Sequence, residues 1–434
     1  MGEVTEGRKS AAAILRAVSR GRRLDLAVGE ISTALSDRDR KWVQEATYGT
    51  VRLRGRLDHL LDLHLRSGIS SLSPLVLDLF RLGAYQLLYM DGVPAYASIS
   101  QTVEQVRAVA GDGGSRLANG VLRSLEREGG ELSRFPSFLS DPESYFSTWG
   151  SHPTWIIRRW LRQWTPEEVS KLVEWNNTPA PLYLRALSTD TKELKSLLLD
   201  QGWESQEVGP GIPCVRLDHG TNPAQMLNAV PGIIQDPGAA LVTVYADVPA
   251  GGLVGDLCAA PGGKTLAMAA GGAYVLAADR SMSRLRLLRE NLARVGGRVD
   301  LVAALAQAPP FRELPTLLLD VPCSGTGTLR RHPDARWRLT SDTLSRLVRL
   351  QEELLTVGSE LVPKGGLLVY STCSLEPEEN QEQVGAFLSR NPEFSIRDSE
   401  TVSREYLDGQ GCLSVVPQAA GFDGAFAARL VRSS

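Results

Sequence analysis

The sequence predicts a multidomain protein in which an all-α bundle and a small α+β module precede an α/β domain built on a mostly parallel sheet. The first observation is the length of 434 residues, which exceeds what one hydrophobic core usually serves. The second is the helical spacing of apolar residues between Ser10 and about Glu128. The third is the alternation of apolar strand, turn and helix from Gly252 onward, which is typical of a sheet covered by helices on both faces.

The N-terminal region predicts a helical domain over residues 1–135. Its most strongly periodic segments are residues 38–52, 75–90 and 99–109, and turn sequences such as residues 91–94 separate them. Each segment carries one apolar face, so packing these faces together would produce a helical bundle.

Residues 136–165 are expected to form a linker that packs against the rest of the protein, because aromatic residues accompany its serines and prolines. At its end, basic and aromatic residues alternate over residues 155–164. Two interpretations of this run stay open. It is either a nucleic-acid-binding surface or an amphipathic helix whose tryptophans are buried and whose arginines are solvated.

Two further domains follow. Residues 166–250 contain strand-like runs at 182–187 and 215–217 around a helical segment at 191–201, which indicates a small α+β module. Residues 251–434 form the α/β domain. Its expected strands are residues 253–257, 274–278, 317–319 and 367–370. Sheets of this kind bind ligands at the carboxyl ends of their strands.

Composition and charge are those of an ordinary globular protein. The formal net charge of −3 does not predict a polyanionic partner, so any RNA contact would depend on local basic patches. The five cysteines are scattered without the paired spacing of a zinc site, which predicts free thiols, no metal and a reducing compartment. No export signal and no run of about 18 apolar residues is evident. We expect a cytoplasmic protein with no membrane contact.

A glycine-rich loop follows the first expected strand of the α/β domain. Its residues are Cys258, Ala259, Ala260, Pro261, Gly262, Gly263 and Lys264. A helix is expected to begin near Thr265, so the loop can bring its backbone N–H groups to a ligand at a helix N-terminus. The spacing matches neither a P-loop nor the full dinucleotide fingerprint. Asp279 ends the next strand, where it would either accept hydrogen bonds from ribose hydroxyls or cap the following helix.

Two cysteines follow the later strands. Cys323 lies in Pro-Cys-Ser-Gly-Thr-Gly shortly after Asp320, and Cys373 lies in Ser-Thr-Cys-Ser. Carbon 5 of cytosine is too poor a nucleophile to attack a methyl sulfonium unless a thiolate first adds to carbon 6. The motifs therefore indicate a cytosine-5 methyltransferase, in which the Asp320 carboxyl group would hydrogen-bond the N3 and amino edge of the base. A buried, unreactive thiol is the alternative for each cysteine.

Charged runs follow both cysteine motifs. Residues 328–338 are strongly basic and are expected to contact phosphate groups, with solvated surface charge as the alternative. Residues 376–380 are acidic and predict the start of a helix, where carboxylates are favoured.

The motifs resemble those of RNA cytosine-5 methyltransferases, in particular bacterial 16S rRNA enzymes of the Sun/Fmu type that carry a NusB-like helical domain. The resemblance spans nearly the whole chain. In the helical half it rests on residues 37–40, 48–52, 82–88 and 119–123. In the catalytic half it rests on Gln235-Asp236, the glycine-rich loop, the two cysteine motifs and residues 422–424.

The resemblance implies a NusB-like RNA-binding bundle, an RNA-recognition-like α+β module and a Rossmann-like methyltransferase core. It implies S-adenosylmethionine as the methyl donor, bound by residues 258–264, Asp279 and Asp320. In such enzymes the cysteine at the position of Cys373 forms the adduct with cytosine C6, and the one at the position of Cys323 assists product release. The implied partner is 16S rRNA or a small-subunit precursor, bound by a monomer.

The sequence departs from this family pattern at several positions. The acidic residue that usually meets the adenine amino group corresponds to Leu305, for which Asp300 is a nearby substitute. Residues 186–187 and Pro315 also differ from the family pattern. One alternative function is therefore an RNA-binding protein with an impaired cofactor site. Another is a cytosine-5 methyltransferase acting on tRNA or on another rRNA site, because no motif specifies the nucleotide.

Overall fold

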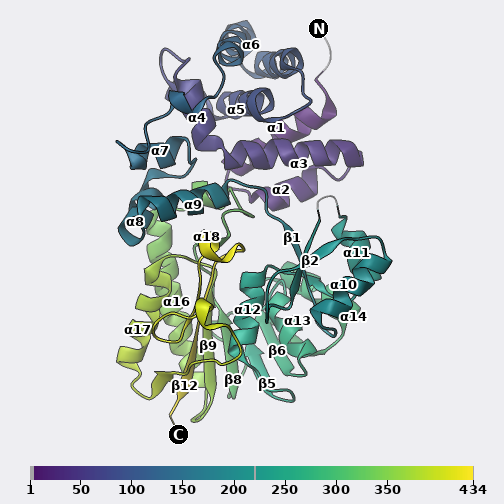
Figure 1. Cartoon of the computed structure of the whole chain (residues 1–434), viewed down its shortest axis with the longest axis vertical. Coiled ribbons are helices and arrows are strands. Elements are labelled where there is room, and N and C mark those ends of the chain that lie inside the picture. The colour runs from purple at the N-terminus through teal and green to yellow at the C-terminus, as the bar shows by residue number, and fades with distance from the viewer. Residues whose placement is uncertain (1–3, 219–220, 434) are drawn as a thin grey trace. The chain divides into compact units, whose positions relative to one another are not determined.

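The computed structural model describes residues 4–218 and 221–433 (Figure 1). Its contacts divide the chain into two compact units. The first comprises Met1–Thr178 and Leu329–Leu339, and the second comprises Pro179–Thr328 and Thr340–Ser434. The second unit therefore contains the glycine-rich loop and both cysteine motifs, whereas a short segment between those motifs belongs to the first unit.

The first unit is helical, as the apolar spacing predicts. Its longer helices are α1 (Glu6–Ser19), α2 (Leu24–Ile31), α3 (Asp37–Arg52), α4 (Arg54–Asp62), α5 (Pro74–Tyr89), α6 (Ala95–Glu128), α8 (Thr154–Gln163) and α9 (Pro166–Asn176), with the short α7 (Pro142–Thr148) between α6 and α8. The expected segments 38–52 and 75–90 are confirmed as α3 and α5. Segment 99–109 lies inside the longer α6, which bends at Gly111, where φ is 64°.

The run of basic and aromatic residues forms the amphipathic helix α8. Ile156, Ile157 and Trp160 are completely buried, whereas Arg158 and Arg162 are exposed. Of the two open interpretations, the structure therefore supports the helix whose apolar face joins the core.

The segment 329–339 packs among the helices of the first unit. Its Arg336, in α15 (Ala335–Arg338), is fully buried. The guanidinium donates hydrogen bonds to the main-chain oxygens of Ser151 and Asn176, both at 3.0 Å, and to the side-chain oxygen of Asn177 at 2.8 Å. Burial lowers the pKa of Arg336 to about 9. The expected phosphate contact is therefore wrong for Arg336, because its donors bind carbonyl groups inside the protein.

The second unit begins with a four-stranded antiparallel sheet of order β2-β3-β1-β4. Its elements are β1 (Leu182–Arg185), α10 (Thr191–Asp200), β2 (Ser205–Glu207), β3 (Cys214–Leu217), α11 (Pro223–Ala229) and β4 (Ile233–Ile234). Leu184, Leu198 and Val215 are fully buried in the core between this sheet and its helices. The strands and the helix expected in this module are confirmed.

The larger sheet has eight strands, with the path β10-β12-β9-β8-β5-β6-β7 and with β11 paired to β12. They are β5 (Leu253–Asp256), β6 (Tyr274–Asp279), β7 (Arg298–Ala303), β8 (Thr316–Asp320), β9 (Leu367–Thr372), β10 (Phe394–Ile396), β11 (Leu413–Val415) and β12 (Ala425–Arg432). Strands β9, β8, β5, β6 and β7 are parallel. The four expected strands are confirmed as β5, β6, β8 and β9. The chain order reverses between the neighbours β5 and β8, and open α/β sheets bind ligands at such a point.

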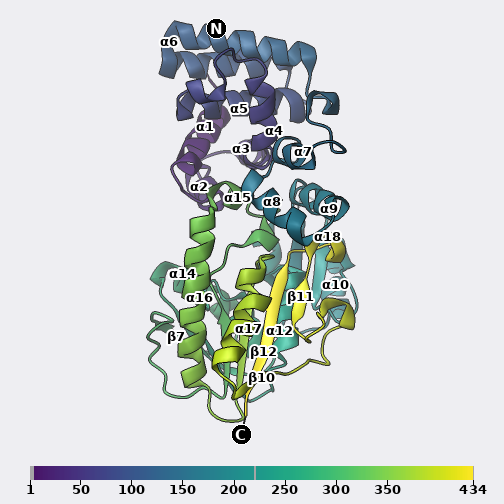
Figure 2. The same cartoon turned by 90° about the vertical axis from the view of Figure 1, so that its left-hand side faces the viewer.

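Helices cover both faces of this sheet (Figure 2). One face holds α12 (Pro237–Ala246), α13 (Gly263–Ala270) and α14 (Met282–Val295), and the other holds α16 (Ser341–Leu361) and α17 (Gln381–Arg390). Successive residues of β8 point to opposite faces, so Leu318 joins the first core while Leu317 and Leu319 join the second. Both cores end where the glycine-rich loop and the cysteine loops leave the strands.

Within residues 4–218 and 221–433, no helix has the length and apolar character needed to cross a membrane. The same residues contain no group of three or more His, Cys, Asp or Glu side chains that could hold a metal ion. All five cysteines are free thiols.

Candidate active site

The glycine-rich loop joins β5 to α13 and borders a cavity. Gly262 has a φ of 107°, and a Cβ at this position would come within 2.1 Å of Leu288, so only glycine fits here. The cavity has a volume of about 350 Å³ and is lined by residues 258–264 together with Gln235, Asp256 and Asp320, among others. This volume is in the range of small-molecule sites in proteins.

Asp256 places a buried carboxyl group at the wall of this cavity. It is 1% exposed, and one oxygen accepts a hydrogen bond from the Thr265 hydroxyl at 2.7 Å. The other oxygen has no hydrogen-bond partner. Burial raises the pKa of Asp256 to about 7. The side chain is therefore an unused acceptor for a ligand that carries an N–H donor.

Asp256→Asn is expected to stabilise the protein more at pH 8 than at pH 5. The folded-state pKa of about 7 exceeds the value of an exposed carboxyl group, so the unfolded chain ionises first as the pH rises. The resulting penalty on the wild-type fold is absent below about pH 4, grows with pH and is complete above about pH 7. The advantage of the variant should grow by on the order of 2 kcal/mol between the two pH values. Thermal unfolding at both pH values tests this, and an advantage that does not grow with pH would disprove the raised pKa.

Asp279 joins the loop to the next helix. It is 4% exposed, and its two oxygens accept hydrogen bonds from the N–H groups of Ala260 at 3.1 Å and Ser281 at 2.8 Å. The N-cap of α14 is Ser281, whose hydroxyl accepts a hydrogen bond from the Arg284 N–H, so the expectation that Asp279 caps this helix is wrong. Asp279 is not among the residues that line the cavity, and a contact with ribose stays a prediction.

The region expected to meet adenine contains no acidic side chain in the usual place. Leu305 is 55% exposed in the loop after β7. Asp300, the candidate substitute, accepts a hydrogen bond from the hydroxyl group of Tyr274. Because Tyr274 begins β6, this contact directs the Asp300 carboxylate toward the amino end of the sheet. Asp300 is therefore poorly placed to replace the missing acid.

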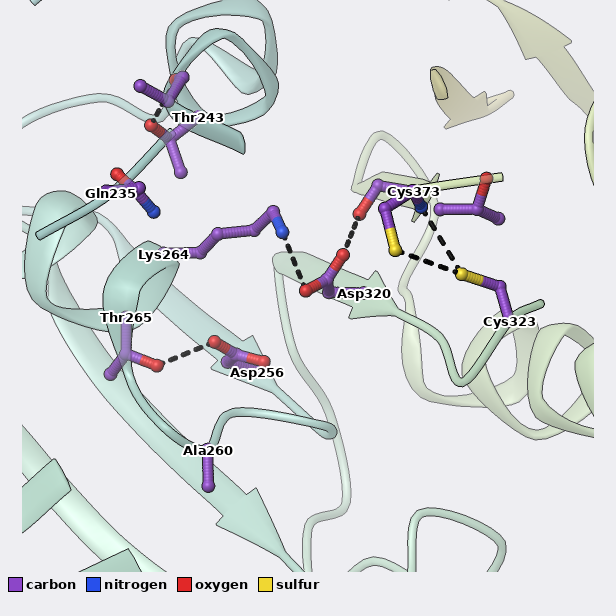
Figure 3. A network of polar contacts seen from close by, with 12 residues as sticks. Gln235, Thr243, Asp256, Ala260, Lys264, Thr265, Asp320, Cys323 and Cys373 are labelled. Carbon is purple, nitrogen blue, oxygen red and sulfur yellow. Dashed lines mark hydrogen bonds and ion pairs between the residues drawn. The ribbon is translucent and has the colours of Figure 1, made fainter. Parts of the chain in front are cut away.

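Lys264 and Asp320 form an ion pair at the cavity (Figure 3). The Lys264 ammonium lies 2.7 Å from one Asp320 oxygen, and the hydroxyl of Ser371 donates to the other at 2.9 Å. Burial acts to lower the pKa of Lys264, but the charge and the hydrogen bond of Asp320 outweigh it and raise the pKa. Lys264 therefore stays cationic and orients the Asp320 carboxylate.

The two cysteines meet because their strands are neighbours. Asp320 of β8 pairs with Ser371 of β9, so the loops that follow these strands lie side by side. The sulfur atoms of Cys323 and Cys373 are 3.3 Å apart, and the N–H of Cys373 points at the Cys323 sulfur at 3.3 Å. The hydrogen bond with Cys373, together with burial, raises the pKa of Cys323. Cys323 is thus held as a neutral thiol beside Cys373.

Glu379 supports both cysteine loops, a role that was not predicted from the sequence. This fully buried carboxylate accepts hydrogen bonds from the Ser324 N–H at 2.9 Å, from the Ser324 hydroxyl and from the Gln351 amide at 2.9 Å. The hydroxyl of Ser324 also lies 3.0 Å from that of Ser374. Glu379 therefore fixes the residues that follow both thiols.

Glu379→Leu is expected to lower the thermal stability and slow the chemical step, whereas Glu379→Gln should retain part of both. Leucine leaves the buried Ser324 N–H without its acceptor and removes one of the two acceptors of the Gln351 amide, at a cost of about 1–3 kcal/mol for each lost hydrogen bond. The matched control is Glu382→Leu, which changes an exposed glutamate of the next helix. Thermal unfolding and single-turnover rates measure the effects. Equal behaviour of the leucine variants at 379 and 382 would rule out this supporting role.

The structure thus brings Asp320 and the glycine-rich loop to one cavity, and it brings Cys323 and Cys373 together in the loops that follow β8 and β9, although neither cysteine lines the cavity. Glu379 and Gln351 were missed, because their contacts join residues far apart in the sequence. The acidic run at 376–380 was a signal for Glu379, but it predicted a helix start rather than a buried acceptor.

Comparison with known families defines the class of this protein. Residues 248–431 match the family model described as 16S rRNA methyltransferase RsmB/F, residues 5–127 match the NusB family, and residues 152–223 match a ferredoxin-like domain of RsmF/B-like methyltransferases. The fold and these matches define an RNA methyltransferase with an N-terminal NusB-like domain.

Similar proteins narrow the class to a family. The ribosomal RNA small subunit methyltransferase B of Cronobacter sakazakii is 32% identical, over 98% of this chain and 97% of its own. A methyltransferase homologue from Pyrococcus horikoshii has a crystal structure with a TM-score of 0.58 and 25% identity, over 68% of this chain and 99% of its own. The crystal structure of PH0851 has a TM-score of 0.81 at 22% identity, with both chains covered completely, and supports the fold alone. The chain belongs to the ribosomal RNA small subunit methyltransferase B family.

Proposed function

We propose that the protein transfers a methyl group from S-adenosylmethionine to C5 of a cytosine in 16S rRNA, through a covalent bond between Cys373 and C6 of the base. The observation that carries the proposal is the convergence of two thiols, 3.3 Å apart, next to the Lys264–Asp320 pair at the cavity. Membership of an rRNA methyltransferase family supports the substrate class.

The residues at the cavity fit the donor. The glycine-rich loop lets the main chain approach a ligand, and the unpaired oxygen of Asp256 offers an acceptor for an amino group. Residues 258–264, Asp279 and Asp320 would hold S-adenosylmethionine, which supplies an electrophilic methyl group when bound. Leu305 would leave the adenine amino group without its usual carboxylate.

The side chains divide the chemistry on the base. Hydrogen bonding of Asp320 to the N3 and amino edge would favour protonation of the ring while the Cys373 thiolate adds to C6. This addition gives C5 enamine character, so that C5 attacks the methyl group. A base then removes the C5 proton and the bond to Cys373 breaks, which restores the aromatic ring and the thiolate. Cys323 lies close enough to Cys373 to assist this release.

We propose that four parts of the chain share this function. We assign residues 1–135 to a NusB-like RNA-binding domain, 136–165 to a linker, 166–250 to the small module and 251–434 to the catalytic domain. The family matches at 5–127 and 152–223 support a NusB-like domain and a ferredoxin-like domain ahead of the catalytic domain. We further propose that the enzyme acts as a monomer on 16S rRNA or a small-subunit precursor in the cytoplasm.

Methylation assays test this function. The purified protein is incubated with isotopically labelled S-adenosylmethionine and with naked 16S rRNA, small-subunit particles or tRNA, and the nucleosides are identified by mass spectrometry. We expect labelled 5-methylcytidine at one position of 16S rRNA. Label in tRNA alone would favour the alternative acceptor, and label at another atom of the base would refute cytosine-5 chemistry.

Leu305 favours one alternative, an RNA-binding protein that has lost its donor site. Calorimetry with S-adenosylmethionine separates the two functions. Binding in the micromolar range supports the methyltransferase, whereas the absence of binding together with retained RNA affinity supports the alternative.

A further inference from the structure

We infer that Gln235, oriented by the buried guanidinium of Arg185, binds the carboxylate of the amino-acid moiety of the donor. The inference rests on the proposed function, because it concerns how the same cavity recognises S-adenosylmethionine. Its observations come from the small antiparallel sheet, which had no role in the chemistry described above.

Arg185 is a buried cation without an anionic partner. It ends β1, is 6% exposed, and donates a hydrogen bond from Nη1 to the Gln235 side-chain oxygen at 2.7 Å. Its Nε has no hydrogen-bond partner, and no ion pair formed within the described ranges of the chain includes it. Burial lowers its pKa only to about 10, so it stays charged at neutral pH. A buried unpaired charge is costly, and an anion near it would offset part of that cost.

Gln235 lies between Arg185 and the cavity, and its contact with Arg185 orients its amide group. Its amide oxygen faces Arg185, which leaves the Nε2 group as the donor on the other side. Gln235 is 8% exposed and lines the cavity. A Cβ on Gly263 would lie 2.7 Å from Gln235 Nε2, so this donor lies beside the first residue of α13.

The N-terminus of α13 adds further donors at the same place. The first hydrogen bond at this end runs from the Leu266 N–H to the Gly262 oxygen at 2.8 Å. The N–H groups of residues 263–265 therefore lack acceptors within the helix, and the helix dipole is positive here. These groups, the Gln235 amide and the charge of Arg185 together favour an acceptor-only anion.

A second feature of the cavity identifies this anion as an amino-acid carboxylate. Asp256, with its unpaired oxygen, and Asp320 line the same cavity. An RNA phosphate carries no ammonium group that could offset the charge of these carboxyl groups, whereas the ammonium group of an amino acid can donate a hydrogen bond to Asp256. A site with donors on one side and an acceptor on the other matches the carboxylate and ammonium of an α-amino acid.

Donor analogues test the inference by calorimetry on the intact protein. Decarboxylated S-adenosylmethionine keeps the sulfonium, the ammonium and the nucleoside, and lacks only the carboxylate. Gln235→Leu should weaken binding of S-adenosylmethionine about 10-fold or more, because a hydrogen bond to a charged group is lost. Binding of the decarboxylated analogue should stay within about twofold. Gln206→Leu, on the exposed part of β2, is the matched control and should leave both affinities unchanged.

Gln235→Glu provides a second variant that should fold well. The new carboxylate would pair with Arg185, so thermal stability should not fall, yet it would repel the donor carboxylate. S-adenosylmethionine should therefore bind more weakly to Gln235→Glu than to Gln235→Leu, and the decarboxylated analogue should bind at least as well as to the wild type. Arg185→Met should reproduce the Gln235→Leu pattern, and Arg216→Met on β3, with its exposed side chain, is its control.

The outcomes separate the inference from the proposed function. A wild-type protein that binds no S-adenosylmethionine would overturn both. Donor binding that falls equally for the two ligands, or that is unchanged in Gln235→Leu and Gln235→Glu, would overturn only the inference. Loss of RNA affinity with unchanged donor binding would also overturn it, because the Arg185–Gln235 pair would then serve a phosphate group.

Discussion

Replacing Cys373 with alanine is expected to abolish methyl transfer to RNA. Without its thiolate no adduct forms at C6, and C5 stays too weak a nucleophile to take the methyl group. The single-turnover rate should fall at least on the order of 10³-fold, as it does when a covalent nucleophile is removed from an enzyme. Quenched time courses with radiolabelled donor and saturating RNA measure this rate.

The controls separate loss of the nucleophile from loss of the fold. Cys373→Ser keeps the size of the side chain and should be inactive too. Cys412→Ala changes a buried thiol in the loop that precedes β11 and should stay active. Donor affinity should be similar in all variants. Cys373→Ala protein that methylates RNA at the wild-type rate would show that another residue attacks the base.

Replacing Cys323 with alanine is expected to leave the protein attached to its RNA. Cys323 is 3.3 Å from Cys373 and is held as a neutral thiol, so it is placed to assist release after methyl transfer. One methyl group should be transferred per enzyme, after which turnover stops. A protein–RNA complex that survives denaturation should accumulate and can be measured by gel electrophoresis.

The double variant is the control for this attachment. Cys323→Ala combined with Cys373→Ala should form no stable complex, because the bond to RNA depends on Cys373. A Cys323→Ala enzyme that turns over freely would remove the release role from Cys323. A complex that persists in the double variant would place the bond elsewhere.

The strand and helix pattern was enough to predict the parallel core, but not its antiparallel edge. Strands β5, β6, β8 and β9 are apolar runs bounded by turns, and local sequence identifies such runs. The helix α12 was not predicted, because it is buried on nearly every side and shows no helical periodicity. The last strand, β12, was not predicted either, and its antiparallel pairing with β9 forms an edge that the pattern of parallel strands does not imply.

In the site, too, residues next to predicted strands could be predicted, whereas contacts between distant parts of the chain could not. Asp320 and both cysteines follow expected strands, so parallel pairing of β8 with β9 was sufficient to bring them together. The contact of Arg185 with Gln235 joins the end of β1 to the residue that follows β4, fifty positions along the chain, and leaves no local pattern. Arg336 illustrates the opposite error. Its basic neighbours predicted a phosphate contact, but Arg336 itself is fully buried among the helices of the first unit.

Trapping the covalent intermediate tests the central claim most directly. The protein is incubated with S-adenosylmethionine and with 16S rRNA in which 5-fluorocytidine replaces cytidine. A base cannot remove fluorine from C5 as it removes the proton, so the elimination that releases the enzyme is blocked. The bond between the protein and C6 should therefore persist after methyl transfer. The account predicts a stable complex whose cross-linked peptide contains Cys373 and whose base carries the transferred methyl group. A cross-link at Cys323, or no complex under conditions in which unmodified 16S rRNA is methylated, would contradict it.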